Sequence, residues 1–224
     1  MEVHGEVIAN NAVIGAILVG GSSRRMGVPK PRVVLKSGLT MVEHVALALG
    51  MFVERIVLVG RSEMAPSFPL QVDLLPDTER GAGPLAAIET LLASGIGQRY
   101  LIAACDQPLL RSQVLIPLLE MPDDAIGVLA TDEGERLDPF PSIWPAAALD
   151  AVREYRAAGG RSVRDFLVTQ STVTRSVPSN LAACVNDFNT MEELLAWGLV
   201  AEKDGASAQT LTVAGEQSDG ALCV

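Results

Sequence analysis

Histidine and cysteine are scarce in this 224-residue chain, and their scarcity argues against several kinds of active site. His4 lies near the N-terminus and His44 in a helix-like segment, so a hydrolase with a histidine base and a histidine-rich metal site are both disfavoured. The cysteines, Cys105, Cys184 and Cys223, show no paired spacing. That pattern disfavours a structural zinc site and fits a reducing compartment.

Long apolar runs and an excess of positive charge are also missing. No stretch reaches the roughly 20 uncharged residues that a membrane span needs. The N-terminus has Glu2 and Glu6 in place of a basic region, so we expect no secretory signal. A formal net charge of -10 argues against general binding to nucleic-acid backbones. We therefore expect a cytoplasmic protein with neither a membrane nor a nucleic acid as partner.

Short apolar runs rich in branched residues alternate with helix-like segments. The expected strands are residues 12–19, 55–60, 70–75, 99–105, 125–130 and 171–177. The expected helices are residues 40–50, 83–95, 148–160 and 190–198. Thr40 with Glu43, and Thr190 with Glu193, have the spacing of capping boxes. The alternation predicts a three-layer α/β fold of the Rossmann-like kind, with a mostly parallel sheet.

The apolar pattern fades after about residue 200. Residues 201–224 are small and polar, with one brief strand-like run, "TLTV". We expect residues 1–200 to form one domain and residues 201–224 to be a loosely held C-terminal extension.

The stretch "VGGSSRRMGVPK" (19–30) joins glycines to three cations directly after the first apolar run. Glycine lets backbone N–H groups approach an anion closely, and cations neutralise it, so a polyphosphate is the natural ligand. The spacing matches neither G-x-x-x-x-G-K-[ST] nor G-x-G-x-x-G. Alone, such a stretch is weak evidence, because a glycine-rich turn after a strand is often only a tight turn.

Acidic and amide side chains follow several other expected strands. Asp77 comes after the third, Asp106 after the fourth, and Asn186, Asp187 and Asn189 precede the last helix. In open α/β sheets, ligands bind outside the carboxyl ends of the strands, so these side chains should share one rim with the glycine-rich stretch. Glycines, cations and separate carboxylates at one rim suit phosphoryl transfer with magnesium.

Single residues also have simpler interpretations, which stay open at this point. Arg24 and Arg25 are consistent with a solvated pair. Asp106 is consistent with a cap of the Gln-Pro turn that follows it. Cys105 suits a small core residue better than a nucleophile. Together, at consistent strand ends, these residues favour a nucleotide site.

The motifs resemble those of the molybdenum cofactor guanylyltransferases, the MobA family of nucleotidyltransferases. "AILVGGSSRRMGVPK" is similar to the signature L-x-G-G-x-S-x-R-M-G-x-x-K, with the lysine spacing kept. "PDT", "GAGPLAAIETLLAS", "LIAACDQPLL" and "DFNTMEEL" continue the match in order, over roughly residues 12 to 198. Residues 138–167 resemble the part of the family that faces the second substrate.

The resemblance implies a nucleotide site and its magnesium ion. Backbone around Leu18, Val19, Gly20 and Gly21 would hold the guanine and ribose of GTP. Arg25 and Lys30 would bind the triphosphate and act in catalysis, with Lys30 facing the α-phosphate. Asp77 would lie near the nucleotide, and Asp106 would be the magnesium ligand and a catalytic residue. Asp187 and Asn189 would lie near the metal and the incoming cofactor.

The implied reaction is transfer of GMP from GTP to the phosphate of molybdopterin, or of its molybdenum-bearing form, with release of pyrophosphate. The attacking phosphate is already an anion, so no histidine base is needed. Catalysis should then be charge neutralisation and in-line alignment. Basic residues among Arg153, Arg156, Arg161 and Arg164 are expected to receive the phosphate of the pterin.

Other functions remain possible on the sequence alone. Cytidylyl transfer to the same pterin and nucleotidyl transfer to a sugar phosphate use the same fold. Relatives of the cytidylyl type tend to have Ala-Gly in the first loop and Pro-Met in the following helix, whereas this chain has Gly20-Gly21 and Pro84-Leu85. A non-catalytic partner of molybdoenzymes is disfavoured because Lys30, Asp77, Asp106 and Asp187 are all present.

We expect a monomer or weak oligomer whose ligands are GTP, Mg²⁺ and the molybdenum cofactor. Molybdoenzymes or cofactor-delivery proteins are its further expected partners.

Overall fold

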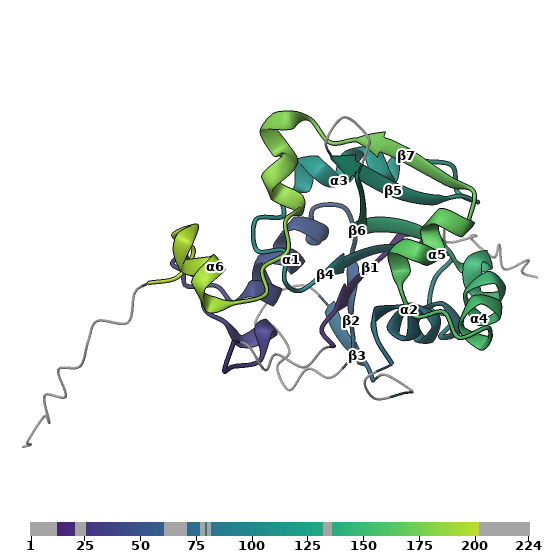
Figure 1. The fold of residues 1–224 in the computed structure, drawn as a ribbon, viewed down its shortest axis with the longest axis horizontal. Coiled ribbons are helices and arrows are strands. Elements are labelled where there is room, and N and C mark those ends of the chain that lie inside the picture. Colours follow the sequence, from purple (N-terminus) through teal and green to yellow (C-terminus); the bar gives the residue numbers. More distant parts are fainter. Residues whose placement is uncertain are drawn as a thin grey trace, which may run out of the picture.

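Seven strands form one mixed sheet in the computed structural model, which describes residues 13–20, 26–60, 71–76, 79, 82–131 and 136–201. The strand order is β3-β2-β1-β4-β6-β5-β7 (Figure 1). The strands are β1 (Val13–Leu18), β2 (Arg55–Val59), β3 (Gln71–Leu75), β4 (Arg99–Ala104), β5 (Ile126–Thr131), β6 (Arg136–Pro145) and β7 (Thr172–Ser176). In this sheet only β6 runs antiparallel to its neighbours, which confirms the expected mostly parallel arrangement.

Helices cover both faces of the sheet (Figure 1). α1 (Met41–Gly50) and α3 (Ser112–Leu119) pack on one face, and α2 (Pro84–Ala93), α4 (Leu149–Ala157) and α5 (Val163–Thr169) pack on the other. Along β1, Ile14 and Ala16 belong to the core beneath α2, whereas Ile17 belongs to the core beneath α1. This alternation follows from the two-residue period of a strand, and it confirms the three-layer fold.

Both predicted capping boxes are present. The backbone N–H of Glu43 donates to Thr40 Oγ1 at 3.3 Å, and Thr40 N–H donates to Glu43 Oε2 at 2.6 Å. Thr190 and Glu193 make the same reciprocal pair at the start of α6 (Met191–Ala196). Each box satisfies N–H groups that a helix start leaves without a partner, so these threonines fix where the two helices begin.

Strand β6 was not predicted, because prolines interrupt it. Its register with β5 shifts between Val128, which pairs with Ser142, and Leu129, which pairs with Asp138. The shift leaves residues 139–141 (Pro-Phe-Pro) outside the regular pairing. Proline has no N–H to donate, so a bulge is where a strand tolerates it.

Helices α3 and α5 also lie in segments for which the sequence predicted no helix.

A third, smaller core attaches α6 to the segment that follows the glycine-rich stretch. Its buried members are Met26, Val33, Leu35, Met41, Phe188, Leu194 and Val200. Because Val33 follows η1 (Lys30–Arg32) and Phe188 precedes Asn189, this cluster brings the two segments together from opposite ends of the chain. The predicted extension, residues 201–224, lies outside the described residues except for Ala201.

Within the described ranges, the helices are too short or too polar to cross a membrane.

Replacing Thr40 by alanine should lower the free energy of unfolding by about 1 kcal/mol, because Glu43 N–H loses its side-chain acceptor. Urea unfolding followed by circular dichroism measures the difference. Thr40→Ser keeps the hydroxyl and is the matched control. An alanine variant as stable as the unmodified chain would contradict the assignment of the cap.

Candidate functional site

A cavity of about 480 Å³ lies where β1 and β4 end. Leu18 at the end of β1 pairs with Ala104 at the end of β4, and Cys105 N–H donates to the Leu18 carbonyl at 3.1 Å. The cavity is therefore at the carboxyl edge of the sheet, as the strand-end rule predicts. Its lining residues are Leu18, Gly20, Lys30, Gly83, Pro84, Ala87, Ala104, Cys105, Asp106, Gln107, Asp138, Pro139, Phe140, Arg164, Val185 and Asp187.

One ammonium group joins two segments of the cavity wall. Lys30 Nζ lies 2.7 Å from Asp106 Oδ2 and 2.7 Å from Asn189 Oδ1. The Lys30 and Asp106 side chains are only 17% and 19% exposed, so the pair is partly withdrawn from water. A charge-assisted hydrogen bond is stronger in such surroundings than at an open surface. The pair therefore sets both the position and the charge of this part of the wall.

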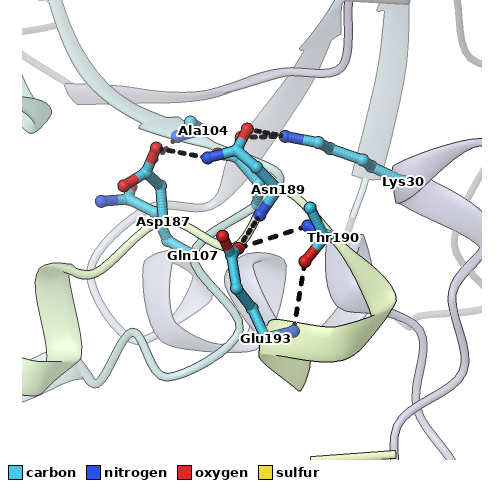
Figure 2. Close-up of polar contacts among 8 residues, drawn as sticks. Lys30, Ala104, Gln107, Asp187, Asn189, Thr190 and Glu193 are labelled. Carbon is cyan, nitrogen blue, oxygen red and sulfur yellow. Dashed lines mark hydrogen bonds and ion pairs between the residues drawn. The ribbon is translucent and has the colours of Figure 1, made fainter. Parts of the chain in front are cut away.

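Asn189 connects this pair to a second carboxylate (Figure 2). Its side-chain nitrogen donates to Asp187 Oδ2 at 3.0 Å, while its oxygen accepts from Lys30. Its backbone N–H donates to Glu193 Oε2 at 2.6 Å, so the capping box of α6 also holds Asn189 in place. The result is a continuous chain of contacts from Asp187 through Asn189 and Lys30 to Asp106.

Gln107 fixes the loop that presents Asp106, and the sequence did not identify it. The side chain is buried; its Oε1 accepts from Ala104 N–H at 3.2 Å. Its Nε2 donates to the carbonyls of Phe140 (2.7 Å) and Val185 (3.0 Å). Gln107 thus ties the end of β4 to β6 and to η4 (Ser179–Val185). The only signal in the sequence was its place in the Asp-Gln-Pro turn.

The simpler interpretation of Asp106 as a turn cap is not supported. Backbone bonds close the turn: Gln107 N–H donates to Ala104 O, and Leu110 N–H donates to Gln107 O. The Asp106 carboxylate instead contacts Lys30, far away in sequence.

Cys105 matches its predicted role as a small core residue, because burial, with a smaller effect of Asp106, raises the pKa of its thiol. A thiol held protonated is a poor nucleophile.

Of the other predicted nucleotide residues, the structure describes four, and it brings three of them to the same cavity. Leu18, Gly20 and Asp187 line it. The Val19 side chain packs in the core beneath α1, and its N–H donates to Val59 O at 2.9 Å, so that N–H already serves the sheet. The predictions for Gly21, Arg25 and Asp77 fall outside the described residues.

The acceptor phosphate was expected to bind basic residues among four arginines, and these four lie in different surroundings. Arg164, on α5, lines the cavity. Arg156 forms ion pairs with Glu79 and Glu89, and Arg153 lies 3.6 Å from Glu89. α4 packs against α2, and the carboxylates on that side attract the guanidinium groups of Arg153 and Arg156. Which of the four arginines receives the acceptor phosphate stays a prediction.

A tight metal cage is not present among the described residues, which contain no group of three or more His, Cys, Asp or Glu side chains placed to hold an ion. Magnesium does not require one, because it usually takes one or two protein carboxylates and completes its shell with phosphate oxygens and water. The carboxylates of Asp106 and Asp187 at one cavity fit that pattern.

Comparison with known proteins identifies the family of this chain. The model of the MobA-like NTP transferase domain matches residues 15–173. A relative from Mycobacterium marinum, named "Probable molybdenum cofactor guanylyltransferase", is 35% identical over 191 residues, which cover 83% of this chain and 92% of the relative. A relative from Cupriavidus metallidurans, named molybdenum cofactor guanylyltransferase, is 28% identical over 198 residues, covering 84% and 95% of the two chains.

Solved structures share the fold. Molybdopterin-guanine dinucleotide biosynthesis protein A from Archaeoglobus fulgidus superposes with a TM-score of 0.65 at 23% identity, covering 82% of this chain and 96% of that one. The 2-C-methyl-D-erythritol 4-phosphate cytidylyltransferase from Thermus thermophilus gives a TM-score of 0.61 at 16% identity, covering 84% and 97%. At these identities the likeness concerns the fold alone.

We expect Gln107→Leu to lower the free energy of unfolding by about 2 to 4 kcal/mol, because it leaves two carbonyls and one N–H without their buried partner. Urea denaturation measures the loss. Gln113→Leu, at an exposed position of α3, is the matched control and should change stability little. Equal stability of the two variants would show that Gln107 does not hold the loop.

Proposed function

The chain belongs to the MobA-like NTP transferase family, and we propose that it is a molybdenum cofactor guanylyltransferase. It transfers GMP from GTP to the phosphate of molybdopterin, or of the molybdenum cofactor, and releases pyrophosphate. The observation that carries this proposal is the contact between Lys30 and Asp106 at a cavity on the carboxyl edge of the sheet. An ammonium group suits a phosphate and a carboxylate suits a magnesium ion, so this contact supports the proposal.

The protein would promote this reaction mainly by neutralising charge. The nucleophile is a phosphate anion and the target is a phosphorus atom surrounded by negative oxygens, so the protein must bring anions together. Lys30 neutralises charge at the α-phosphate, and Arg25 is proposed to do the same along the triphosphate. No side chain has to remove a proton from the nucleophile, which agrees with the scarcity of histidine.

We propose Asp106 as the protein ligand of Mg²⁺, with Asp187 as the second carboxylate at the cavity. The ion supplies neutralisation of phosphate oxygens during transfer. Asp106 contacts Lys30 in the structure, and we propose that this contact gives way when Asp106 binds the ion and Lys30 binds phosphate. Asn189 bonds to Lys30 and to Asp187, and it can keep both side chains oriented during that exchange.

The acceptor is proposed to enter between β6 and α5. Arg164 is the guanidinium that lines this part of the cavity, and it is our candidate for the acceptor phosphate. The partners proposed beyond the substrates are molybdoenzymes or cofactor-delivery proteins. A monomer or weak oligomer and a cytoplasmic location likewise stay predictions.

The direct test mixes the protein with Mg²⁺, molybdopterin and one nucleoside triphosphate at a time, and measures pyrophosphate. We expect release with GTP and the pterin together. Release without the pterin would indicate another acceptor, such as water or a sugar phosphate.

GTP with magnesium should raise the melting temperature more than CTP, ATP or UTP, because a ligand that binds the native state stabilises it by mass action. The preference for GTP is expected from the Gly20-Gly21 and Pro84-Leu85 pairs in the sequence, and Gly20 and Pro84 line the cavity. Differential scanning fluorimetry at equal nucleotide concentrations measures the shift. An equal or larger shift with CTP would favour the cytidylyl alternative.

Asp106→Asn should lower the rate of GMP transfer by roughly two or more orders of magnitude, since it removes a preorganised charge and keeps the size of the side chain. Extra magnesium should recover only part of the loss. Asp124→Asn, at an exposed turn, is the control, and melting curves establish that both variants fold. Near-normal transfer by Asp106→Asn would move the metal site elsewhere, most simply to Asp187.

A further inference from the structure

Phe140 gives the cavity wall an aromatic ring. Among the described residues that line the cavity, only Phe140 is aromatic. Its side chain is half-buried, and the buried part packs against the core beneath α2. Ring contacts among the described residues join Trp144, Tyr155, Phe166, Phe188 and Trp197, and Phe140 takes part in none of them. An aromatic side chain at a cavity wall, on which no other described ring stacks, is suited to contact with a flat ligand ring.

The backbone that carries this ring is held on both sides. Phe140 belongs to the bulge at residues 139–141, and its carbonyl accepts from Gln107 Nε2 at 2.7 Å. The Pro139 carbonyl accepts from Ser142 Oγ at 2.8 Å, and Ser142 Oγ in turn accepts from Trp144 Nε1 at 2.9 Å. Ser142 and Trp144 are fully buried. Bulges often re-aim a side chain next to an active site, and a prearranged side chain loses little freedom when a ligand binds.

The same contacts fix Phe140 relative to the reaction centre. Gln107, which holds the Phe140 carbonyl, directly follows Asp106, and its Oε1 accepts from Ala104 N–H at the end of β4. The pairing of β4 with β6 ends at Ile102 and Ser142, so the bulge begins where this pairing stops. The ring is therefore attached to the loop that presents the proposed ligand of Mg²⁺.

The order of the strands separates Phe140 from the proposed nucleotide residues. Leu18 and Gly20 line the cavity at the end of β1, Asp106 lines it after β4, and Phe140 lines it from β6. Neighbouring strands lie roughly 4.8 Å apart, so β1 and β6 are separated by about 10 Å. With the nucleotide at β1, the side of the cavity at β6 is left for the acceptor.

This side of the cavity combines an apolar wall with a cation. Pro139 and Phe140 supply the wall, and Arg164, on α5, lines the same cavity. α5 packs against β6, and its Val163 and Phe166 belong to the core that Phe140 contacts. A pterin with a phosphate has a flat fused ring at one end and an anion at the other, so it matches this pair of features.

We propose that Phe140 binds the acceptor by stacking on the flat face of its pterin ring, while Arg164 binds its phosphate. The inference rests on the proposed function, because it takes that acceptor as the ligand. Phe140 acts on the affinity for the acceptor and not on the chemical step, since its side chain has no charge and no proton to transfer.

The test compares variants that keep or remove the ring. Phe140→Leu keeps an apolar side chain but removes the aromatic face, and it should raise the KM for molybdopterin about three- to tenfold. Its KM for GTP and its kcat should stay within about twofold. Phe140→Tyr keeps the ring and should keep the KM for molybdopterin within about twofold. Calorimetric titration with molybdopterin and Mg²⁺, without GTP, should show the same order of Kd values.

Phe52→Leu is the matched control. Phe52 lies in the turn after α1, is 38% exposed and is not among the lining residues of the cavity. The same substitution there should leave both KM values unchanged. Melting curves of the variants establish that each one folds.

The results distinguish this inference from the proposed function. If the unmodified chain transfers GMP to molybdopterin and Phe140→Leu has an unchanged KM for molybdopterin, the role of Phe140 is wrong and the function stands. A rise in the KM for GTP alone, or an equal rise in both KM values, has the same meaning, because it assigns Phe140 to the nucleotide or to the general structure. Failure of the unmodified chain to transfer GMP to molybdopterin would overturn both.

Discussion

The balance of charge at Lys30 is the constraint on which the candidate site depends. An ammonium group that is mostly out of water needs acceptors, and it has them in Asp106, after β4, and Asn189, before α6. To meet both, the chain must bring together residues 76 and 159 positions away from Lys30. The small core around Met41 and Phe188 supplies the apolar contacts that keep these segments adjacent.

Gln107 and Glu193 show how the surrounding fold supports that balance. Gln107 fixes the backbone of the loop that carries Asp106, with bonds to two other elements. Glu193 caps α6 and, through the same carboxylate, fixes the backbone of Asn189. Neither side chain was predicted as a site residue, yet both restrict the positions from which Asp106 and Asn189 reach Lys30. Gln107 is buried and its amide is bonded through both oxygen and nitrogen, an arrangement that confers this kind of rigidity.

Local patterns in the sequence predicted the features that depend on residues close together in the chain. Apolar runs located six strands, Thr40 and Thr190 located two helix starts, and the strand-end rule placed Asp106 and Asp187 at one cavity. The features that the sequence did not predict depend on contacts that form only when the chain folds. Prolines concealed β6, because the bulge that accommodates them exists only beside β5. The ion pairs of Arg156 with Glu79 and Glu89 were not predicted either, because they join segments that are far apart in the sequence.

The position of β6 has a consequence for association between chains. In the described sheet, β6 is the only strand that connects the parallel set β3-β2-β1-β4 to the parallel pair β5-β7. Each set can pair internally, but β4 and β5 keep open edges until β6 lies between them. Unpaired edges are where strands of different molecules associate, so a chain in which β6 is displaced exposes two strand edges to aggregation. The prolines within β6, which cannot donate to a foreign strand, make β6 itself a poor template for such pairing.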